Sequence, residues 1–169
     1  TRLRHKPKVG VSRCLLGDAV RYDGDSKPDD IVIHELSTIF ELIPVCPEVE
    51  AGLGIPRPPV QLTGSLDTPR MTGRDDAALD VTEAIVEWCE HRIPALQELS
   101  GYICKSRSPS CGLGTTPLFI DGECVTETAD GMFIRHLRQH YPGLVIIDEL
   151  GLQDDTARQG FIEQVKQTR

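Results

Sequence analysis

The chain has 169 residues, a length typical of one domain, and 39% of them are hydrophobic, which is enough to form one core. Its 26 acidic and 18 basic residues give a net charge of −8, which argues against general binding to nucleic-acid backbones or anionic membranes, because both need clustered Lys and Arg. The sequence contains neither an apolar run of about 20 residues nor the pattern of a secretory signal, so we expect one cytoplasmic globular domain (residues 1–169) that acts on a small molecule.

Short apolar strands alternate with helical periodicity along the first half of the chain. Residues 8–12 predict a strand, apolar residues at helical spacing follow over about 31–40, and residues 42–45 predict a second strand. The segment 46–56 contains two prolines and two glycines and is predicted to be a loop, and we expect the proline-rich segment 56–76 to be irregular.

The same alternation continues in the second half. Residues 80–99 have helical spacing, although Pro94 is expected to kink or divide that helix. Residues 101–104 predict a third strand, and the hydroxyl and turn residues of 105–114 predict a loop after it. The remaining predicted elements are a hairpin around Asp121-Gly122, a helix capped by Asp130 that ends near Tyr141, a strand at 144–147 and a helix over about 153–165.

Strands that alternate with helices predict an α/β fold, a Rossmann-like three-layer sandwich with a mostly parallel sheet. In such folds ligands bind beyond the carboxyl ends of the strands. Cys14, Cys46 and Cys111 each follow a predicted strand. We therefore expect the three thiols to lie together at this edge of the sheet.

The chemistry of the cysteines leaves three alternatives. The chain has six cysteines and no Cys-x-x-Cys pair, and in a reducing compartment disulfides are not expected. Three thiolates without a fourth protein ligand are typical of an iron–sulfur cluster with one open iron, which could take a substrate atom. The alternatives are small buried residues, and a zinc site with three thiolates and one water, which would predict a hydrolase.

Glu48 is a candidate general base. It lies two residues after Cys46, where exclusion from water would raise its pKa and let it accept a proton. An exposed loop carboxylate is the commoner situation for a lone glutamate.

Polar residues before Cys111 are candidates for contacts with a substrate. Ser106, Ser108 and Ser110 alternate, so an extended loop would present all three on one face, unless they bond the loop backbone instead. Arg107 and Lys105 either contact an anionic ligand or are solvated surface charges.

Five motifs taken together resemble those of a bacterial family that was long without an assigned function and whose characterised members are thiouracil desulfidases. They are Val-Ser-Arg-Cys14-Leu-Leu-Gly, Arg21-Tyr-Asp-Gly24, Val-Cys46-Pro-Glu48-Val-Glu-Ala-Gly-Leu-Gly54, Thr72-Gly-Arg-Asp75 and Lys105-Ser-Arg-Ser-Pro-Ser-Cys111-Gly. The resemblance extends from about residue 8 to the C-terminal helix.

The resemblance implies an oxygen-sensitive 4Fe–4S cluster held by Cys14, Cys46 and Cys111, with the fourth iron open to the sulfur of a thiocarbonyl substrate. It places the glutamate of the family's Cys-Pro-Glu motif at Glu48 and its catalytic serine at Ser108. The implied reaction is a hydrolytic, non-redox desulfuration of a thiolated pyrimidine base, nucleoside or nucleotide, with release of hydrogen sulfide. Ser106, Arg107 and Ser110 would then be candidate substrate contacts. Cys104 departs from the family pattern, in which an aliphatic residue is expected.

Two other functions compete with a desulfidase. One is a non-catalytic iron–sulfur protein for redox sensing or for delivery of sulfur or iron, in which Glu48 would have no essential part. The other is a three-cysteine zinc hydrolase, which would contain zinc without acid-labile sulfide.

Overall fold

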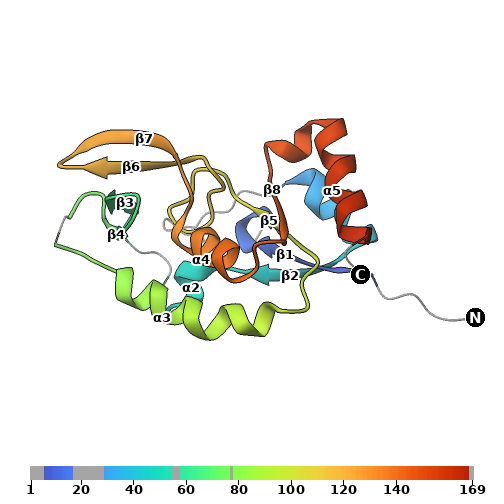
Figure 1. Cartoon of the computed structure of the whole chain (residues 1–169), viewed down its shortest axis with the longest axis horizontal. Helices are drawn as coiled ribbons and strands as arrows, with labels where there is room; N and C mark the ends of the chain where they lie inside the picture. Colours follow the sequence, from blue (N-terminus) through green and yellow to red (C-terminus); the bar gives the residue numbers. More distant parts are fainter. Residues whose placement is uncertain (1–5, 17–28, 55–57, 77, 168–169) are drawn as a thin grey trace, which may run out of the picture.

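The computed structural model describes residues 6–16, 29–54, 58–76 and 78–167. These residues form an α/β fold with two four-stranded sheets (Figure 1). The α/β class and a mostly parallel sheet, which the sequence predicts, are confirmed. The second sheet is not predicted by the sequence, and the description of the chain as one Rossmann-like domain stays a prediction.

The first sheet, sheet A, is parallel throughout and has the strand order β2-β1-β5-β8. All four of its strands are predicted from the sequence to within one residue at each end. Their side chains are largely buried or half-buried, as is usual for parallel strands that are covered on both faces. The strands are β1 (Lys8–Ser12), β2 (Glu41–Val45), β5 (Gly101–Cys104) and β8 (Val145–Asp148).

The second sheet, sheet B, is mixed and has the order β4-β3-β6-β7, with β3 and β6 parallel and the other pairs antiparallel. The strands are β3 (Val60–Gly64), β4 (Pro69–Gly73), β6 (Thr116–Ile120) and β7 (Glu123–Ala129).

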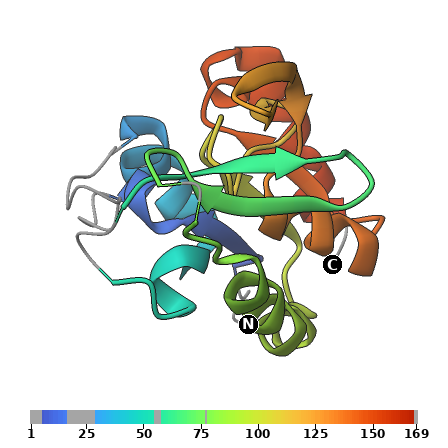
Figure 2. The ribbon, with the colours of Figure 1, turned by 90° about the vertical axis from the view of Figure 1, so that its left-hand side faces the viewer.

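The β6–β7 hairpin confirms the predicted turn, since Asp121 and Gly122 both have positive φ, at 52° and 83°. The irregular structure predicted for 56–76 is wrong, because β3 and β4 form a hairpin there. Figure 2 shows this hairpin, with α3 (Thr82–Arg92) below it.

One face of sheet A packs against helices from both ends of the chain. η2 (Ile31–Leu36), which α1 (Ser37–Ile39) continues, fills the region predicted as helical at 31–40. Together with α5 (Asp155–Gln167), η2 buries Val9, Val11 and Ile103.

The opposite face of sheet A packs against α3 and α4 (Met132–His140), which bury Tyr102 and Cys104. Pro94 divides the predicted long helix, since α3 ends at Arg92 and a 3₁₀ turn, η3 (Ile93–Leu96), follows.

Asp130 does not cap α4 as predicted. The N-cap residue is Gly131, and the Asp130 carboxylate instead accepts hydrogen bonds from the Gly114 N–H and the Arg138 guanidinium, both at 2.8 Å. The prediction is wrong because the carboxylate has partners outside the first turn of the helix.

Three short helical turns complete the fold, namely η1 (Arg13–Leu16), α2 (Pro47–Glu50) and η4 (Gly151–Gln153). α2 lies inside the segment 46–56 that is predicted to be a loop, with Pro47 at a first-turn position that proline tolerates. Among the described residues, no helix is both long and apolar enough to cross a membrane.

Candidate active site

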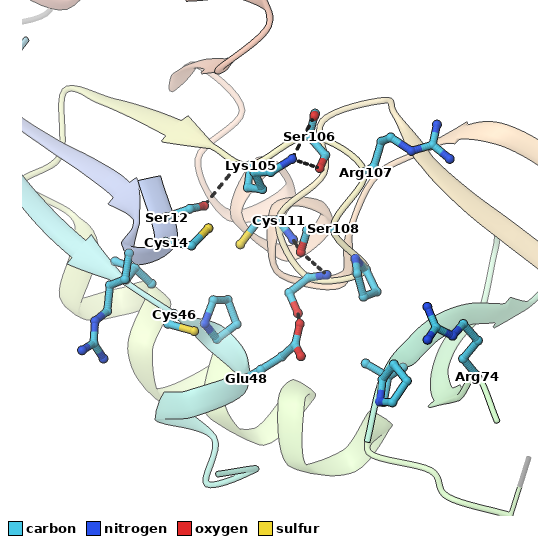
Figure 3. Close-up of a pocket in the computed structure, with 17 residues that line it drawn as sticks. Ser12, Cys14, Cys46, Glu48, Arg74, Lys105, Ser106, Arg107, Ser108 and Cys111 are labelled. Carbon is cyan, nitrogen blue, oxygen red and sulfur yellow. Dashed lines mark hydrogen bonds between the residues drawn. The ribbon is translucent and has the colours of Figure 1, made fainter. Parts of the chain in front are cut away.

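A pocket of about 390 Å³ opens at the carboxyl ends of β1, β2 and β5. One wall comes from the residues that follow these strands in sheet A. The other side includes Val60 of β3 and Arg74, which follows β4. The position agrees with the expectation that ligands bind at this edge of a parallel sheet. Figure 3 shows the side chains that line it.

Cys14, Cys46 and Cys111 all line this pocket. Cys14 lies in η1 directly after β1, Cys46 follows β2 as the N-cap residue of α2, and Cys111 lies in the loop after β5. In Figure 3 the sulfur atoms of Cys14 and Cys111 face one another, and Cys46 lies next to Glu48. The fold therefore brings together three thiols that are far apart in the sequence.

The other three cysteines do not line the pocket. Cys89 in α3 and Cys104 in β5 are buried in the core, and Cys124 in β7 is exposed. Burial raises the pKa of Cys89 to about 12 and that of Cys104 well above its ordinary value, so both are thiols at neutral pH.

The pKa of Cys111 depends on the other two pocket cysteines. Burial raises the pKa of Cys111 well above its ordinary value, and a hydrogen bond with Ser12 only partly offsets this. The Cys46 and Cys14 sulfurs raise the pKa further, as does Glu48. A metal centre bound here would act in the opposite direction, because a coordinating thiol is deprotonated.

The donor set of the pocket fits an iron–sulfur cluster. Its three thiolates are soft ligands, the kind that such clusters use. Among the described residues, no three His, Cys, Asp or Glu side chains are placed to hold a single metal ion. In a cluster each thiolate bonds its own iron, so the three thiols do not need to meet at one point.

Tyr102 of β5 is fully buried behind the pocket. Burial raises the pKa of Tyr102, as do the charges of Cys111, Cys104 and Cys46, whereas a hydrogen bond with Ser12 lowers it. Ser12 therefore interacts with both Tyr102 and Cys111.

Glu48 lies in the first turn of α2 and lines the pocket. It is partly buried, and its Oε2 accepts a hydrogen bond of 2.8 Å from the hydroxyl of Ser110, which is itself 1% exposed. The carboxylate is therefore oriented by a buried serine and is not the fully exposed loop residue of the alternative interpretation.

The three alternating serines all line the pocket, but each has different partners. Ser106 donates its hydroxyl to Glu149 at 2.7 Å. Ser108 Oγ accepts the backbone N–H groups of Ser110 and Cys111, at 3.2 and 3.0 Å, which leaves its own proton to donate into the pocket. Turns in the loop thus replace the extended arrangement that would have given the serines one shared role.

Positive charge lies at the pocket edge. Arg107 is exposed, has a φ of 63° and donates its backbone N–H to Thr115 Oγ1 at 2.9 Å. Arg74 also lines the pocket, and its Nε lies 3.7 Å from Asp75 Oδ1. The other polar motif of the resemblance, at 21–24, lies outside the described residues.

Several contacts made by residues near the pocket are not evident in the sequence. Ser12 Oγ accepts the Lys105 backbone N–H at 3.2 Å. Glu50 Oε2 accepts the Cys46 N–H at 2.9 Å. Glu149 contacts Lys105 and Ser106 more than 40 positions away. Only Glu50 had a local signal, a glutamate in the first turn of a helix that begins with a proline.

Comparison with known proteins shows which family the chain belongs to. A family model described as 2-thiouracil desulfurase matches residues 9–149. The uncharacterized protein YbbK of Bacillus subtilis (strain 168) is 31% identical over 110 residues, which are 62% of this chain and 72% of YbbK. A solved structure described as the 4Fe–4S-dependent thiouracil desulfidase TudS is 32% identical, with a TM-score of 0.68 over 88% of this chain and 94% of the TudS chain. This chain therefore belongs to the 2-thiouracil desulfurase family of enzymes.

Proposed function

We propose that the protein removes sulfur from a thiolated pyrimidine by hydrolysis, without net oxidation or reduction, and with the help of a 4Fe–4S cluster. The observation that carries this proposal is the placement of three cysteines and the Glu48–Ser110 pair in one pocket. TudS, described as 4Fe–4S-dependent, supports the choice of cofactor.

Cys14, Cys46 and Cys111 would hold the cluster, which leaves one iron without a protein ligand. When bound, the cluster supplies a Lewis acid that draws electron density from the thiocarbonyl sulfur. The residues of the pocket then have to deliver water to the ring carbon.

Glu48 would act as the general base in this reaction. It takes a proton from the attacking water while a carbon–oxygen bond forms, and the carbon–sulfur bond then breaks. Ser110 holds the carboxylate through its 2.8 Å hydrogen bond, and Ser108 orients the water with its own proton. The protons of the water leave with the sulfur as hydrogen sulfide, so atoms and electrons balance without a redox partner.

The charges at the pocket edge favour an anionic substrate. Arg74 and Arg107 line the pocket and would attract a phosphate, whereas the Lys105 charge is already paired with Glu149. We therefore include a thiolated nucleotide among the candidate substrates, next to the free base and the nucleoside. Ser106 is a weaker candidate for a substrate contact, because its hydroxyl is already bonded to Glu149.

The test is sulfide release by protein that is purified and iron-reconstituted without oxygen. Iron, zinc and acid-labile sulfide are measured in the same sample that is incubated with 2-thiouracil, 4-thiouracil and 4-thiouridine 5′-monophosphate. Cluster-dependent release from any of them is the expected result. A filled cluster without release would instead favour a carrier or sensor, and zinc without sulfide would favour a zinc hydrolase.

Replacing Glu48 with Gln separates catalysis from cluster binding. Loss of a general base lowers the rate by a factor of about 10² to 10⁴, so Glu48→Gln should retain its iron but release sulfide at least about 100-fold more slowly. Glu163→Gln, at an exposed position of α5, is the control and should keep both properties. Full activity in Glu48→Gln would contradict the assigned role.

A further inference from the structure

Glu149 connects the end of sheet A to the loop that carries the candidate catalytic residues. It follows β8 directly, and its Oε1 accepts the backbone N–H of Ser106 at 2.6 Å. Its Oε2 accepts the Ser106 hydroxyl at 2.7 Å and the Lys105 ammonium at 3.0 Å. One carboxylate therefore makes three hydrogen bonds to two consecutive residues.

The strand pairing explains why Glu149 reaches this loop. β8 lies parallel to β5, with Asp148 opposite Cys104, so the next residue of each strand enters the same edge of the sheet. The Glu149 backbone N–H also donates to the Cys104 carbonyl, at 3.3 Å. The sheet thus holds the Glu149 backbone at the edge from which its carboxylate reaches the loop.

These contacts are made where water is largely absent. The Glu149 side chain is 14% exposed and that of Lys105 is 22% exposed. Burial opposes ionisation of Glu149, but the Ser106 hydrogen bonds and the Lys105 charge outweigh it and lower the pKa of the carboxyl. Hydrogen bonds to an ionised group are stronger than those between neutral groups. The hydrogen bonds that the ionised Glu149 carboxylate accepts from Lys105 and Ser106 are therefore stronger than those of a neutral side chain would be.

The loop over residues 105–111 contains a strained residue and lines the pocket. Directly after Ser106, Arg107 has a positive φ of 63°, a conformation that costs energy for a residue other than glycine. Ser108, Ser110 and Cys111 follow within four residues, and each contributes to the pocket. A shift at Ser106 would therefore move the candidate base partner Ser110 and the candidate ligand Cys111 together.

We propose that Glu149 is a positioning residue for the desulfuration site. It holds the start of the loop so that Ser108, Ser110 and Cys111 meet Glu48 and the other two cysteines in a fixed arrangement. It also occupies the Lys105 ammonium, which lines the pocket. This inference rests on the proposed function for its catalytic consequence, but the anchoring itself can be measured without any reaction.

The experiment compares wild-type protein with Glu149→Gln and Glu149→Ala. Glu98→Gln is the matched control, because Glu98 forms an ion pair of the same 3.0 Å length with Lys8 but is 73% exposed and outside the pocket. Amide hydrogen exchange of residues 105–111 is measured in metal-free protein, and loss of iron to a chelator is measured in reconstituted protein. Sulfide release then gives kcat and KM.

Loss of the anchor should affect the loop and the chemical step more than substrate affinity. We expect exchange at 105–111 and the rate of iron loss to rise at least about tenfold, which corresponds to about 1.4 kcal/mol. We expect kcat to fall by about 10- to 100-fold, the usual effect of removing an outer-shell partner, with KM within about threefold. Exchange in α3 should stay unchanged, which separates this effect from general unfolding.

Unchanged loop exchange and unchanged iron loss in Glu149→Gln would overturn the proposal. If Glu149→Ala does not fold, the Gln variant alone decides. If the wild-type protein binds the cluster but releases no sulfide, the proposed function fails, and with it the catalytic part of this inference, whereas the exchange and iron-loss measurements still decide whether Glu149 anchors the loop.

Discussion

Gly131 shows how closely single residues are packed behind the pocket. A Cβ atom at this position would clash with the Ser110 carbonyl carbon and would lie 2.7 Å from the Cys111 nitrogen. The Gly131 N–H also donates to the Gly112 carbonyl at 2.7 Å, so neither backbone can move away easily. The absence of a side chain at Gly131 therefore sets the position of the loop that carries Cys111.

Replacing Gly131 with Ala should destabilise the protein by about 1–3 kcal/mol, the usual cost of forcing an extra methyl group into a packed region. The variant should also bind less iron after reconstitution. Urea unfolding of the metal-free protein and iron analysis measure the two effects. Gly160→Ala in α5 is the control, because open space surrounds Gly160 and alanine should stabilise a helix there by up to about 1 kcal/mol. Equal stability of Gly131→Ala and wild type would show that the loop is loosely packed.

At the scale of elements, the site depends on three loops that leave the same edge of sheet A. Each loop contributes one cysteine to the pocket, and the remaining three cysteines lie in α3, β5 and β7. The fold thus separates the three cysteines that line the pocket from the three that do not, and spacing in the sequence does not show this division.

This division predicts how serine substitutions affect cluster binding. Cys14→Ser, Cys46→Ser and Cys111→Ser should each lose most of their iron and all cluster-dependent sulfide release. Cys89→Ser and Cys124→Ser should retain both, because neither side chain reaches the pocket. Iron and sulfide are quantified after anaerobic reconstitution of each variant. A full iron complement in any of the first three would remove that residue from the ligand set.

The strands of sheet A could be predicted because each is a short apolar run between turn residues, and their order along the chain also placed Cys14, Cys46 and Cys111. In sheet B the β6–β7 hairpin was predicted, but β3 and β4 were missed. Prolines at the start of β4 and before β3 obscure the pattern of a strand. In addition, β3 pairs with β6 through Leu62 and Leu118, and no local pattern reports a contact over that distance. The same limit applies to Glu149, whose role depends entirely on the pairing of β5 with β8.

At the scale of the whole molecule, three side chains have a lower pKa in the folded chain than in the unfolded chain, namely Glu149, Asp80 and His136. Burial opposes ionisation of Asp80 as it does for Glu149, but hydrogen bonds from Thr82 and the Arg70 charge lower the pKa of Asp80. Burial also lowers the pKa of His136. In all three cases the unfolded chain binds more protons than the folded chain over the affected pH range, so acid favours unfolding.

The free energy of unfolding should therefore fall steadily on acidification. The loss begins below about pH 6.5, where His136 is protonated in the unfolded chain, and continues below about pH 4.5, as the pH falls through the lowered pKa values of Glu149 and Asp80. Urea unfolding of metal-free protein at pH 7.5, 5.5 and 4.0 measures this dependence. Glu149→Gln should lose less stability than wild type between pH 5.5 and 4.0, and parallel curves would show that Glu149 does not contribute.

The wide separation of Cys14, Cys46 and Cys111 along the chain also limits when their site can be complete during maturation. No segment shorter than 98 residues contains all three, and β1, β2 and β5 must already be paired before their loops share one edge. During synthesis, the set of three cysteines is complete only when residue 111 has been added to the chain. The complete donor set proposed for the cluster therefore exists only when residue 111 has been made and the three strands have paired, whether pairing precedes iron binding or iron binding drives it.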